Sequence, residues 1–387
     1  MTAISLTATP ARSPVGLRER IPALDSLRGA AILAVFAYHA FFWSGMRTDW
    51  WLARGIALVT RPGWLGVDLF FVLSGFLITG RLLDHRYLSA PDFYRWFYTR
   101  RALRILPLYY ITLIVVGSAM RWTGETSLSF LIVSAFFMPN IALLAGLWAS
   151  SPLAVLWSLG IEEQVYLVWP FLVRSLTART LAWFFVALGL IEPLLRYVSF
   201  STGMIREGIA VATWLRLDGF AWGGLLSILI RDARFHGRRL AAFGVAAIVV
   251  AVGGAVTCAW LGYLSRRTGV GSAAQLACAD LLFAGLLAVA LGGSSDAPMQ
   301  PRRAGEVLRY FGRISYCLYL VHQFAFWSFD RIVTAGQPRP FGPILVRAVV
   351  VLALSTAIAE LSWRYLEAPS LALRPRCRKS FAFPAIT

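Results

Sequence analysis

The chain has 387 residues, of which 58% are hydrophobic and only 14% are charged. A soluble domain usually carries about 25% charged residues, so this composition excludes an ordinary cytosolic enzyme, and the chain is too apolar for intrinsic disorder. The charge is one-sided, with 37 Lys+Arg against 19 Asp+Glu and a net charge of +18; because the arginines lie between long apolar runs, they indicate a membrane surface rather than nucleic acid as the partner.

Apolar runs that are long enough to be transmembrane helices follow one another along the whole sequence. A helix needs about 20 mostly apolar residues to cross a bilayer. Eleven runs are candidates: residues 28–46, 64–83, 104–120, 128–147, 155–173, 180–199, 208–230, 240–262, 275–293, 313–330 and 342–366. The sequence therefore predicts an all-α, polytopic membrane bundle without a soluble domain. No signal peptide with a cleavage site precedes the first run, so we expect that run to remain in the mature protein.

The distribution of basic residues distinguishes two topologies. If the N-terminus is cytosolic and all eleven runs cross, 17 basic residues lie inside and 18 outside. If the fourth and fifth runs together make one crossing, the split becomes 24 inside and 11 outside. Cytosolic loops are enriched in Lys and Arg, so we expect about ten membrane helices with both termini cytosolic. The fourth run, which contains Met138-Pro139-Asn140, is then a re-entrant or partial span.

The ends of the chain are more polar than the region between them. We expect a cytosolic N-terminal tail over residues 1–21, a membrane domain over residues 22–367 and a basic cytosolic tail over residues 368–387. The four cysteines have neither the spacing of a metal site nor that of a disulfide framework. We therefore expect no metal site and no permanently bound cofactor.

The first run carries two ionisable groups that a lipid-embedded helix seldom tolerates without a function. Arg28 and His39 are eleven residues apart, which is almost three turns, or roughly 16 Å along one face. We expect them to look into one cavity without touching, with Arg28 near the cytosolic surface and His39 near the middle of the membrane. A long ligand with an anionic head and a reactive tail would suit this spacing. Alternatively, Arg28 anchors the helix end and His39 is a structural histidine.

The next charged groups lie in the second run and in the basic stretch after it. Asp68 stands in an aromatic segment, where its carboxylate is expected to pair with another group. Arg100 and Arg104 lie one turn apart and share a helix face. An inside-positive topology accounts for most of the arginines in this stretch. Alternatively, the excess over that need, with Arg101 beside Arg100 and Arg104, binds a multiply phosphorylated cytosolic ligand.

The fifth run opens with a polar stripe. Ser158, Glu162 and Tyr166 recur four residues apart, directly after Trp157, and so share one helix face. Two adjacent acids that enter an apolar helix are hard to explain as a solvated face. We therefore assign a functional role to Glu162.

Two later runs also contain polar groups at membrane depth. Arg216 and Asp218 are separated by about 200° around a helix, so they cannot face each other. Each needs a partner on another helix or in the ligand, and a purely structural pairing remains open. In the tenth run, Tyr316, Tyr319 and His322 recur at steps of three. We expect His322 to be a supporting group rather than a base.

Together, these segments resemble the acyltransferase-3 family of integral membrane O-acyltransferases over roughly residues 22–367. Six patterns in order carry the resemblance: Arg28 with His39, Gly66–Phe76, Arg100 and Arg101 with Arg104 and Pro107, Trp157–Glu162, Arg216 and Asp218 with Gly223, and Ile314–His322. One such pattern would be weak, whereas six in order are strong. The soluble hydrolase-like domain that some members append is not expected in this chain.

The resemblance implies a ten-helix protein of the bacterial cytoplasmic membrane that takes an acyl group, typically acetyl, from cytosolic acyl-coenzyme A. The acceptor it implies is a hydroxyl of a surface polysaccharide, peptidoglycan, glycolipid or macrolide. The family gives catalytic weight to His39 and Arg28, and Glu162 is a third catalytic candidate that would orient or deprotonate the imidazole or the acceptor. His39 would act as general base or carry the acyl group briefly. The candidates for substrate binding are Asp25, Asp68, Arg100, Arg101, Arg104, Trp157, Ser158, Tyr166, Arg216, Asp218, Tyr316 and His322.

The main alternative is a transporter or flippase for a lipid-linked glycan, which would also need ten spans and buried charges. The spacing of Arg28 and His39 beside a cytosolic arginine cluster favours the enzyme, because a flippase has no need to place them together. A non-catalytic scaffold would have no reason to bury Arg216 and Asp218. A nucleic-acid binder is disfavoured because the basic residues are divided among many short loops.

Overall fold

The structure is a computed structural model that describes residues 21–46, 49–147, 149–205, 208–263, 268–293, 303–334 and 340–374. These residues form helices, with one isolated β-bridge between Thr126 and Ala149, so the predicted all-α fold is confirmed. The predicted N-terminal tail up to residue 20, the C-terminal tail beyond residue 374 and Trp148 lie outside the described residues.

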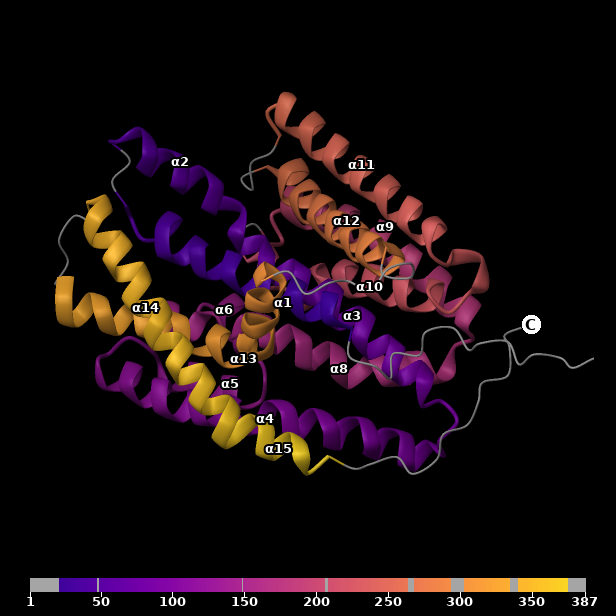
Figure 1. The fold of residues 1–387 in the computed structure, drawn as a ribbon, viewed down its shortest axis with the longest axis horizontal. Coiled ribbons are helices and arrows are strands. Elements are labelled where there is room, and N and C mark those ends of the chain that lie inside the picture. The colour runs from indigo at the N-terminus through magenta and orange to yellow at the C-terminus, as the bar shows by residue number, and fades with distance from the viewer. Residues whose placement is uncertain are drawn as a thin grey trace, which may run out of the picture.

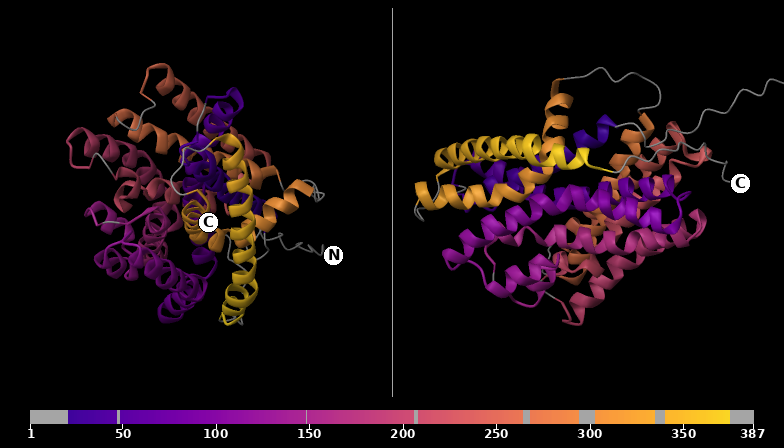
Figure 2. Two further views of the ribbon diagram at one scale, coloured as in Figure 1. Left: turned by 90° about the vertical axis from the view of Figure 1, so that its left-hand side faces the viewer. Right: turned by 90° about the horizontal axis from the view of Figure 1, so that it is seen from below.

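The α-helices follow one another through the bundle shown in Figures 1 and 2. They are α1 (Pro22–Ala37), α2 (Trp51–Thr60), α3 (Gly66–Asp84), α4 (Ala90–Trp122), α5 (Leu128–Ala135), α6 (Pro139–Leu144), α7 (Ser151–Ala154), α8 (Trp157–Ser175), α9 (Ala178–Ser201), α10 (Leu217–Leu229), α11 (Arg238–Trp260), α12 (Gly269–Gly293), α13 (Arg303–Phe329), α14 (Phe341–Ser362) and α15 (Ala368–Ala372). Short 3₁₀ segments are η2 (Arg61–Leu65), η3 (Ile209–Val211), η4 (Thr213–Leu215) and η5 (Ala233–Phe235). Three π-helical segments are η1 (Tyr38–Phe42), η6 (Asp330–Thr334) and η7 (Trp363–Glu367).

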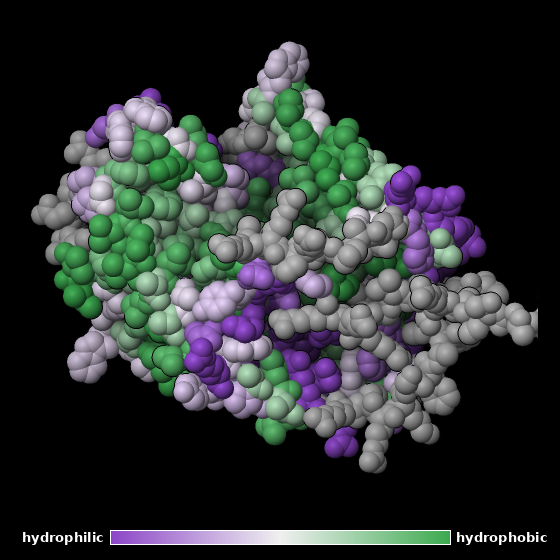
Figure 3. All heavy atoms as spheres, viewed as in Figure 1, coloured by the Kyte–Doolittle hydropathy of each residue, from purple (hydrophilic) through white to green (hydrophobic). Residues whose placement is uncertain are grey.

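Helix α3 lies at the centre of the bundle. It packs against α1, α8, α10 and α12, and Figure 1 shows it between a group formed by α9–α12 and a second group formed by α4, α5 and α8. The outward faces of α9, α11 and α14 carry exposed aliphatic side chains such as Leu190, Val249 and Val349. Hydrophobic residues also cover much of the face drawn in Figure 3. These surfaces suit contact with lipid.

Two helices that are far apart in the sequence, α1 and α13, pack with their backbones in contact. A Cβ atom on Gly29 would lie 1.9 Å from the carbonyl oxygen of Leu308, and a Cβ on Gly312 would lie 1.9 Å from that of Asp25. Only glycine permits such an approach, and small residues serve the same purpose in many membrane helix pairs. This contact fixes the side chains of the first run relative to those of the tenth.

Six helical segments of the described chain are long and apolar enough to cross a membrane: Trp51–Asp84, Ala90–Trp122, Ala178–Ser201, Arg238–Trp260, Gly269–Gly293 and Phe341–Ala372. The other predicted crossings correspond to α1, α8, α10 and α13. Helix α10 has only 13 residues, and α8 carries Glu162, Glu163 and Gln164 in its first half. The protein is therefore a multi-pass membrane protein, while the count of ten crossings stays a prediction.

The fourth apolar run does not form a continuous helix. Its two helices, α5 and α6, have 8 and 6 residues, which span about 12 and 9 Å, far less than the roughly 30 Å of a hydrocarbon core. The chain breaks between them at Phe137, whose φ is 59°. The side-chain amide of Gln164 donates hydrogen bonds to the Phe137 carbonyl (3.0 Å) and to Asn140 Oδ1 (2.8 Å). The expectation of a partial span agrees with this break.

Candidate active site

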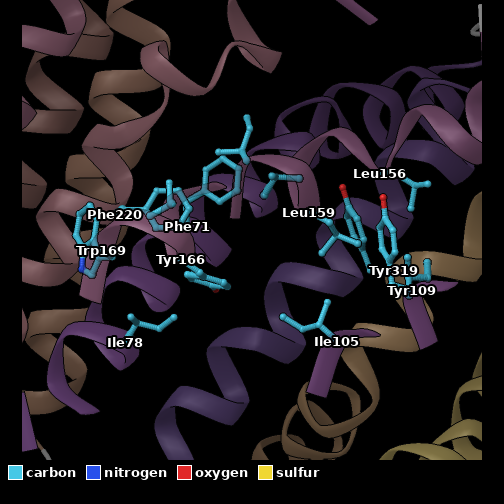
Figure 4. Close-up of a cluster of buried hydrophobic side chains, with 14 of the residues drawn as sticks. Phe71, Ile78, Ile105, Tyr109, Leu156, Leu159, Tyr166, Trp169, Phe220 and Tyr319 are labelled. Carbon is cyan, nitrogen blue, oxygen red and sulfur yellow. The ribbon is translucent and has the colours of Figure 1, made fainter. Parts of the chain in front are cut away.

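A cavity of about 440 Å³ opens between α1, α3, α4, α8 and α13, with the segment η7–α15 on one side. Part of its wall is the central hydrophobic cluster. Figure 4 labels Ile78, Ile105, Leu159, Tyr166 and Tyr319, all of which line the cavity, beside an aromatic group that includes Phe71. The rest of the wall is strongly polar. The cavity therefore combines an apolar portion with a charged one.

The charged portion consists mainly of arginines from five segments. The arginines that line the cavity are Arg28, Arg81, Arg100, Arg101, Arg104, Arg313 and Arg374, and the carboxylates are Asp25, Glu162 and Glu367. Seven positive groups against three negative ones leave an excess of four positive charges when all are ionised. Such a surface attracts polyanions, and guanidinium groups bind phosphate oxygens in bidentate geometry.

Several of these arginines are held by aromatic rings. The guanidinium carbon of Arg101 lies 3.9 Å from the centre of the Tyr166 ring, and that of Arg100 lies 5.6 Å from Trp96. Outside the membrane helices, burial and the neighbouring arginines lower the pKa of Arg374. The neighbouring positive charges therefore destabilise the ionised form of each arginine, and an anion that enters the cluster relieves this repulsion. The predicted role of Arg100, Arg101 and Arg104 as a phosphate-binding group is therefore consistent with their position.

The polar stripe of α8 faces the cavity as its spacing predicts. Ser158, Glu162 and Tyr166 all line it. Ser74 of α3 donates a hydrogen bond to Glu162 Oε1 (2.5 Å) and accepts one from the Tyr166 hydroxyl (2.9 Å). The Glu162 carboxylate is thus oriented by two hydroxyl groups in series, and it lines the same cavity as Arg28.

The inner end of the polar stripe meets α13. The Ser158 hydroxyl lies 2.8 Å from the Tyr319 hydroxyl, which also donates to the Val155 carbonyl at 3.1 Å. Tyr316, one turn before, lines the cavity and donates to the carbonyl of Ile105 at 3.0 Å. The tyrosine of the tenth run that had no assigned role, Tyr319, is thus part of the cavity wall.

His39 lies beyond this wall, so the expectation that it shares the cavity with Arg28 is wrong. Its ring belongs to the π-helical segment η1 and faces α13, where Nδ1 lies 3.2 Å from Nε2 of His322. Among the described residues, neither histidine lines the cavity. Tyr319 lies between the cavity, which it lines, and His322, because the centres of these two rings are 5.8 Å apart. Glu162 bonds to Ser74 rather than to the imidazole, so orientation of His39 comes from another group.

Three of the predicted substrate-binding residues, Asp68, Arg216 and Asp218, belong to a separate, buried charge network, and a fourth, Trp157, lies beside it. Arg216 donates to Asp68 at 2.8 Å, and its guanidinium carbon is 6.0 Å from the ring of Trp157. Arg196 donates to both oxygens of Asp218, at 3.0 and 2.6 Å. The prediction that Arg216 and Asp218 need partners on other helices is confirmed. Because these side chains lie outside the cavity lining, their contacts are those of helix packing.

Sequence reasoning missed several residues of the buried charge network and of the cavity lining. In the charge network these are Glu192, Arg196 and Asp280, all buried. The rule that was applied to Arg216, that a charge within an apolar run needs a purpose, would have identified them. In the cavity, Arg81 lies two turns after Ser74 on α3 and faces the same side, whereas the contribution of Arg374 from the end of the chain has no local signal.

Comparisons with known proteins give matches along most of the chain. A family model described as an acyltransferase domain matches residues 21–360. The peptidoglycan O-acetyltransferase OatA of Listeria monocytogenes is 28% identical over 381 aligned residues, which cover 91% of this chain and 56% of the relative. The O-acetyltransferase OatA of Staphylococcus aureus (strain NCTC 8325 / PS 47) is 26% identical over 383 residues, or 94% of this chain and 58% of the relative.

A shorter match has higher identity. The putative peptidoglycan O-acetyltransferase YrhL of Bacillus subtilis is 38% identical over 161 residues, which cover 39% of this chain and 23% of that protein. This chain therefore spans little more than half the length of the curated relatives that it matches along its whole length. No solved structure gives a significant match.

Proposed function

This chain belongs to the acyltransferase-3 family, and we propose that it is a membrane O-acetyltransferase. Acyl-coenzyme A is the donor, and a hydroxyl group of a cell-wall or other surface glycan is the acceptor. The observation that carries the proposal is the cavity, in which seven arginines lie beside an apolar and aromatic wall. The names of the curated relatives support acetyl transfer to a sugar polymer.

The two portions of the cavity correspond to the two parts of coenzyme A. Its nucleotide head carries several phosphate charges, which match the excess of arginine over carboxylate. Its long, weakly polar arm ends in the thioester, and the cavity wall formed by Leu73, Leu77, Leu159 and Phe70 offers an apolar path for it. The path ends at Ser158 and Tyr319, so this wall has to open for the thioester to reach His39.

The transfer step needs a base and a route for one proton. His39 takes the proton of the acceptor hydroxyl while the acceptor oxygen attacks the thioester carbonyl carbon. The ester C–O bond forms, the C–S bond breaks, and the proton passes to the departing thiolate of coenzyme A. In the second route, the His39 nitrogen attacks first and the acceptor then attacks the acyl-imidazole. Both routes give the same products.

The direction of transfer follows from the predicted topology. The arginines of α4 lie on the cytosolic side, where acyl-coenzyme A is made, and both termini share that side. The acceptor approaches from the outer side, so the acyl group crosses much of the membrane inside the protein. Glu162 then assists the transfer by polarising Ser74 and Tyr166 at the cavity wall.

The test uses the purified protein in lipid nanodiscs. We expect it to release coenzyme A from acetyl-coenzyme A slowly alone and faster with soluble peptidoglycan fragments, with acetyl esters appearing on the glycan. Macrolide and glycolipid acceptors are the comparison set. If the protein binds no acetyl-coenzyme A and consumes none with any acceptor, but moves a lipid-linked glycan between leaflets, the transporter alternative is correct.

A further inference from the structure

His39 and His322 contact each other through their imidazole rings, although 283 residues separate them in the sequence. Nε2 of His322 lies 3.2 Å from Nδ1 of His39, and the ring centres are 5.1 Å apart. His322 is fully buried. A contact between two nitrogens at this distance is a hydrogen bond only if one carries a proton and the other does not.

The protons of His322 are assigned by its own backbone contacts. Its Nδ1 lies 2.7 Å from the carbonyl oxygen of Tyr319 and 3.2 Å from that of Leu318. Carbonyl oxygens only accept, so Nδ1 of His322 carries the proton. Nε2 of the neutral ring is then an acceptor, directed at His39.

The proton of His39 follows from two independent contacts. Its Nδ1 lies 2.9 Å from the carbonyl oxygen of Val35 and 3.2 Å from the acceptor nitrogen of His322. Both neighbours accept, so Nδ1 of His39 carries the proton. The other nitrogen, Nε2, is then unprotonated in the neutral ring and is the only one that can act as base or nucleophile.

We propose that His322 is a positioning residue that holds His39 in the tautomer with a proton on Nδ1 and a lone pair on Nε2. This inference rests on the proposed transferase function for its catalytic meaning. A histidine base is usually oriented by a group bonded to its second nitrogen, most often a carboxylate or a carbonyl. In the part of the chain that the structure describes, no carboxylate is hydrogen-bonded to either ring, so the orienting groups are a second imidazole and a backbone carbonyl.

The surroundings keep this pair in place. Phe36 and Phe326 pack beside it, with ring centres 5.0 Å apart and Phe36 6.4 Å from His322. Arg347 also lies in this region, where it donates to both oxygens of Asp330 at 2.7 and 2.8 Å and approaches the Ala40 carbonyl at 3.5 Å. Since Asp330 satisfies this arginine, its charge does not compete for the hydrogen bond between the imidazoles.

The tautomer can be measured in the unmodified protein. The chain has only four histidines, so imidazole ¹⁵N labelling gives four ring systems, which single histidine substitutions assign. In nanodiscs at neutral pH, we expect His39 and His322 both to carry the proton on Nδ1, with a scalar or dipolar coupling between His39 Nδ1 and His322 Nε2. A proton on Nε2 of His39 would overturn the proposal, whether or not the protein proves to be a transferase.

A matched pair of variants tests the catalytic consequence. Glutamine in His322→Gln has an amide oxygen near the position of Nε2 and keeps the acceptor, whereas methionine in His322→Met has similar length without a strong acceptor. We expect H322Q to retain at least a tenth of the wild-type kcat and H322M to lose about 10²- to 10⁴-fold, the usual contribution of a positioned base. Because His322 lies outside the cavity lining, the Kd for acetyl-coenzyme A should stay within threefold in both.

The outcomes separate this inference from the proposed function. If folded H322Q and H322M have equal activity, whether high or low, the acceptor role of His322 is wrong. If the wild-type protein transfers no acyl group at all, the transferase proposal fails, and the ¹⁵N measurement still decides whether the two histidines share the predicted proton.

Discussion

Replacing Arg104 by glutamine removes one of the seven guanidinium groups around the cavity. If the cavity binds the phosphate-bearing head of coenzyme A, this variant should weaken binding of the donor. It should have a much smaller effect on the rate at saturating donor, because Arg104 lies in the arginine group and not beside the histidines.

The magnitude follows from the type of contact. A hydrogen bond to a charged group contributes about 1.5–3 kcal/mol, and 1.4 kcal/mol is a factor of ten in affinity. The Kd for acetyl-coenzyme A should therefore rise about 10- to 150-fold. Arg28 and Arg101 line the same cavity, so removing one like charge also relieves repulsion in the empty protein. This places the expected loss in the lower half of that range.

The assay is isothermal titration of nanodisc-embedded protein with acetyl-coenzyme A, followed by transfer kinetics. Arg95→Gln is the matched control, because Arg95 lies on the same helix, is exposed and does not line the cavity. Arg104→Lys keeps the charge without the bidentate geometry and should fall between the two. If R104Q and R95Q change Kd equally, the arginine group serves topology only and the donor binds elsewhere.

Three further outcomes are expected. His39→Ala should lose about 10²- to 10⁴-fold in transfer with an unchanged unfolding temperature, and transfer near the wild-type rate would remove the catalytic role. Gly29→Ala places a Cβ 1.9 Å from the carbonyl oxygen of Leu308 and should lower the free energy of unfolding by about 1–3 kcal/mol. Gly253→Ala, whose Cβ meets open space, is the control. Equal melting temperatures of the two variants would contradict the backbone contact between α1 and α13. After replacement of the native cysteines, an impermeant thiol reagent applied to intact cells should label a cysteine at Ser150 but not one at His236, and the reverse pattern would mean eleven crossings.

The apolar runs located most of the long helices but not their full length. The third apolar run was placed at 104–120, whereas α4 covers Ala90–Trp122. A hydropathy pattern identifies only the apolar part of a helix, and the first turns of α4 are polar. These turns are stabilised by the Ser89 side chain, which accepts a hydrogen bond from the amide of Asp92 at 3.3 Å. The short helix α2 between the first two runs was missed for a related reason, because ten residues give no spanning signal.

The candidate site was predictable where one helix carries it. Ser158, Glu162 and Tyr166 share a face of α8 because of helical periodicity alone, and all three line the cavity. The contact of His39 with His322 depends instead on how two distant helices pack. No spacing within one run contains that information, so the orienting group of His39 was not predicted.

The helix pair α1 and α13 connects the two parts of the site. Arg28 and Arg313 line the cavity at one end of the pair, and His39 and His322 meet at the other. The glycine contacts described above bring the two backbones together near the arginine end, so the separation between Arg28 and the two histidines is set by helix length. Side chains, in contrast, can change rotamer without moving a backbone. Between the cavity and the histidines lies the hydroxyl contact of Ser158 with Tyr319. In the proposed transfer, a rotamer change at this contact would let the thioester reach His39.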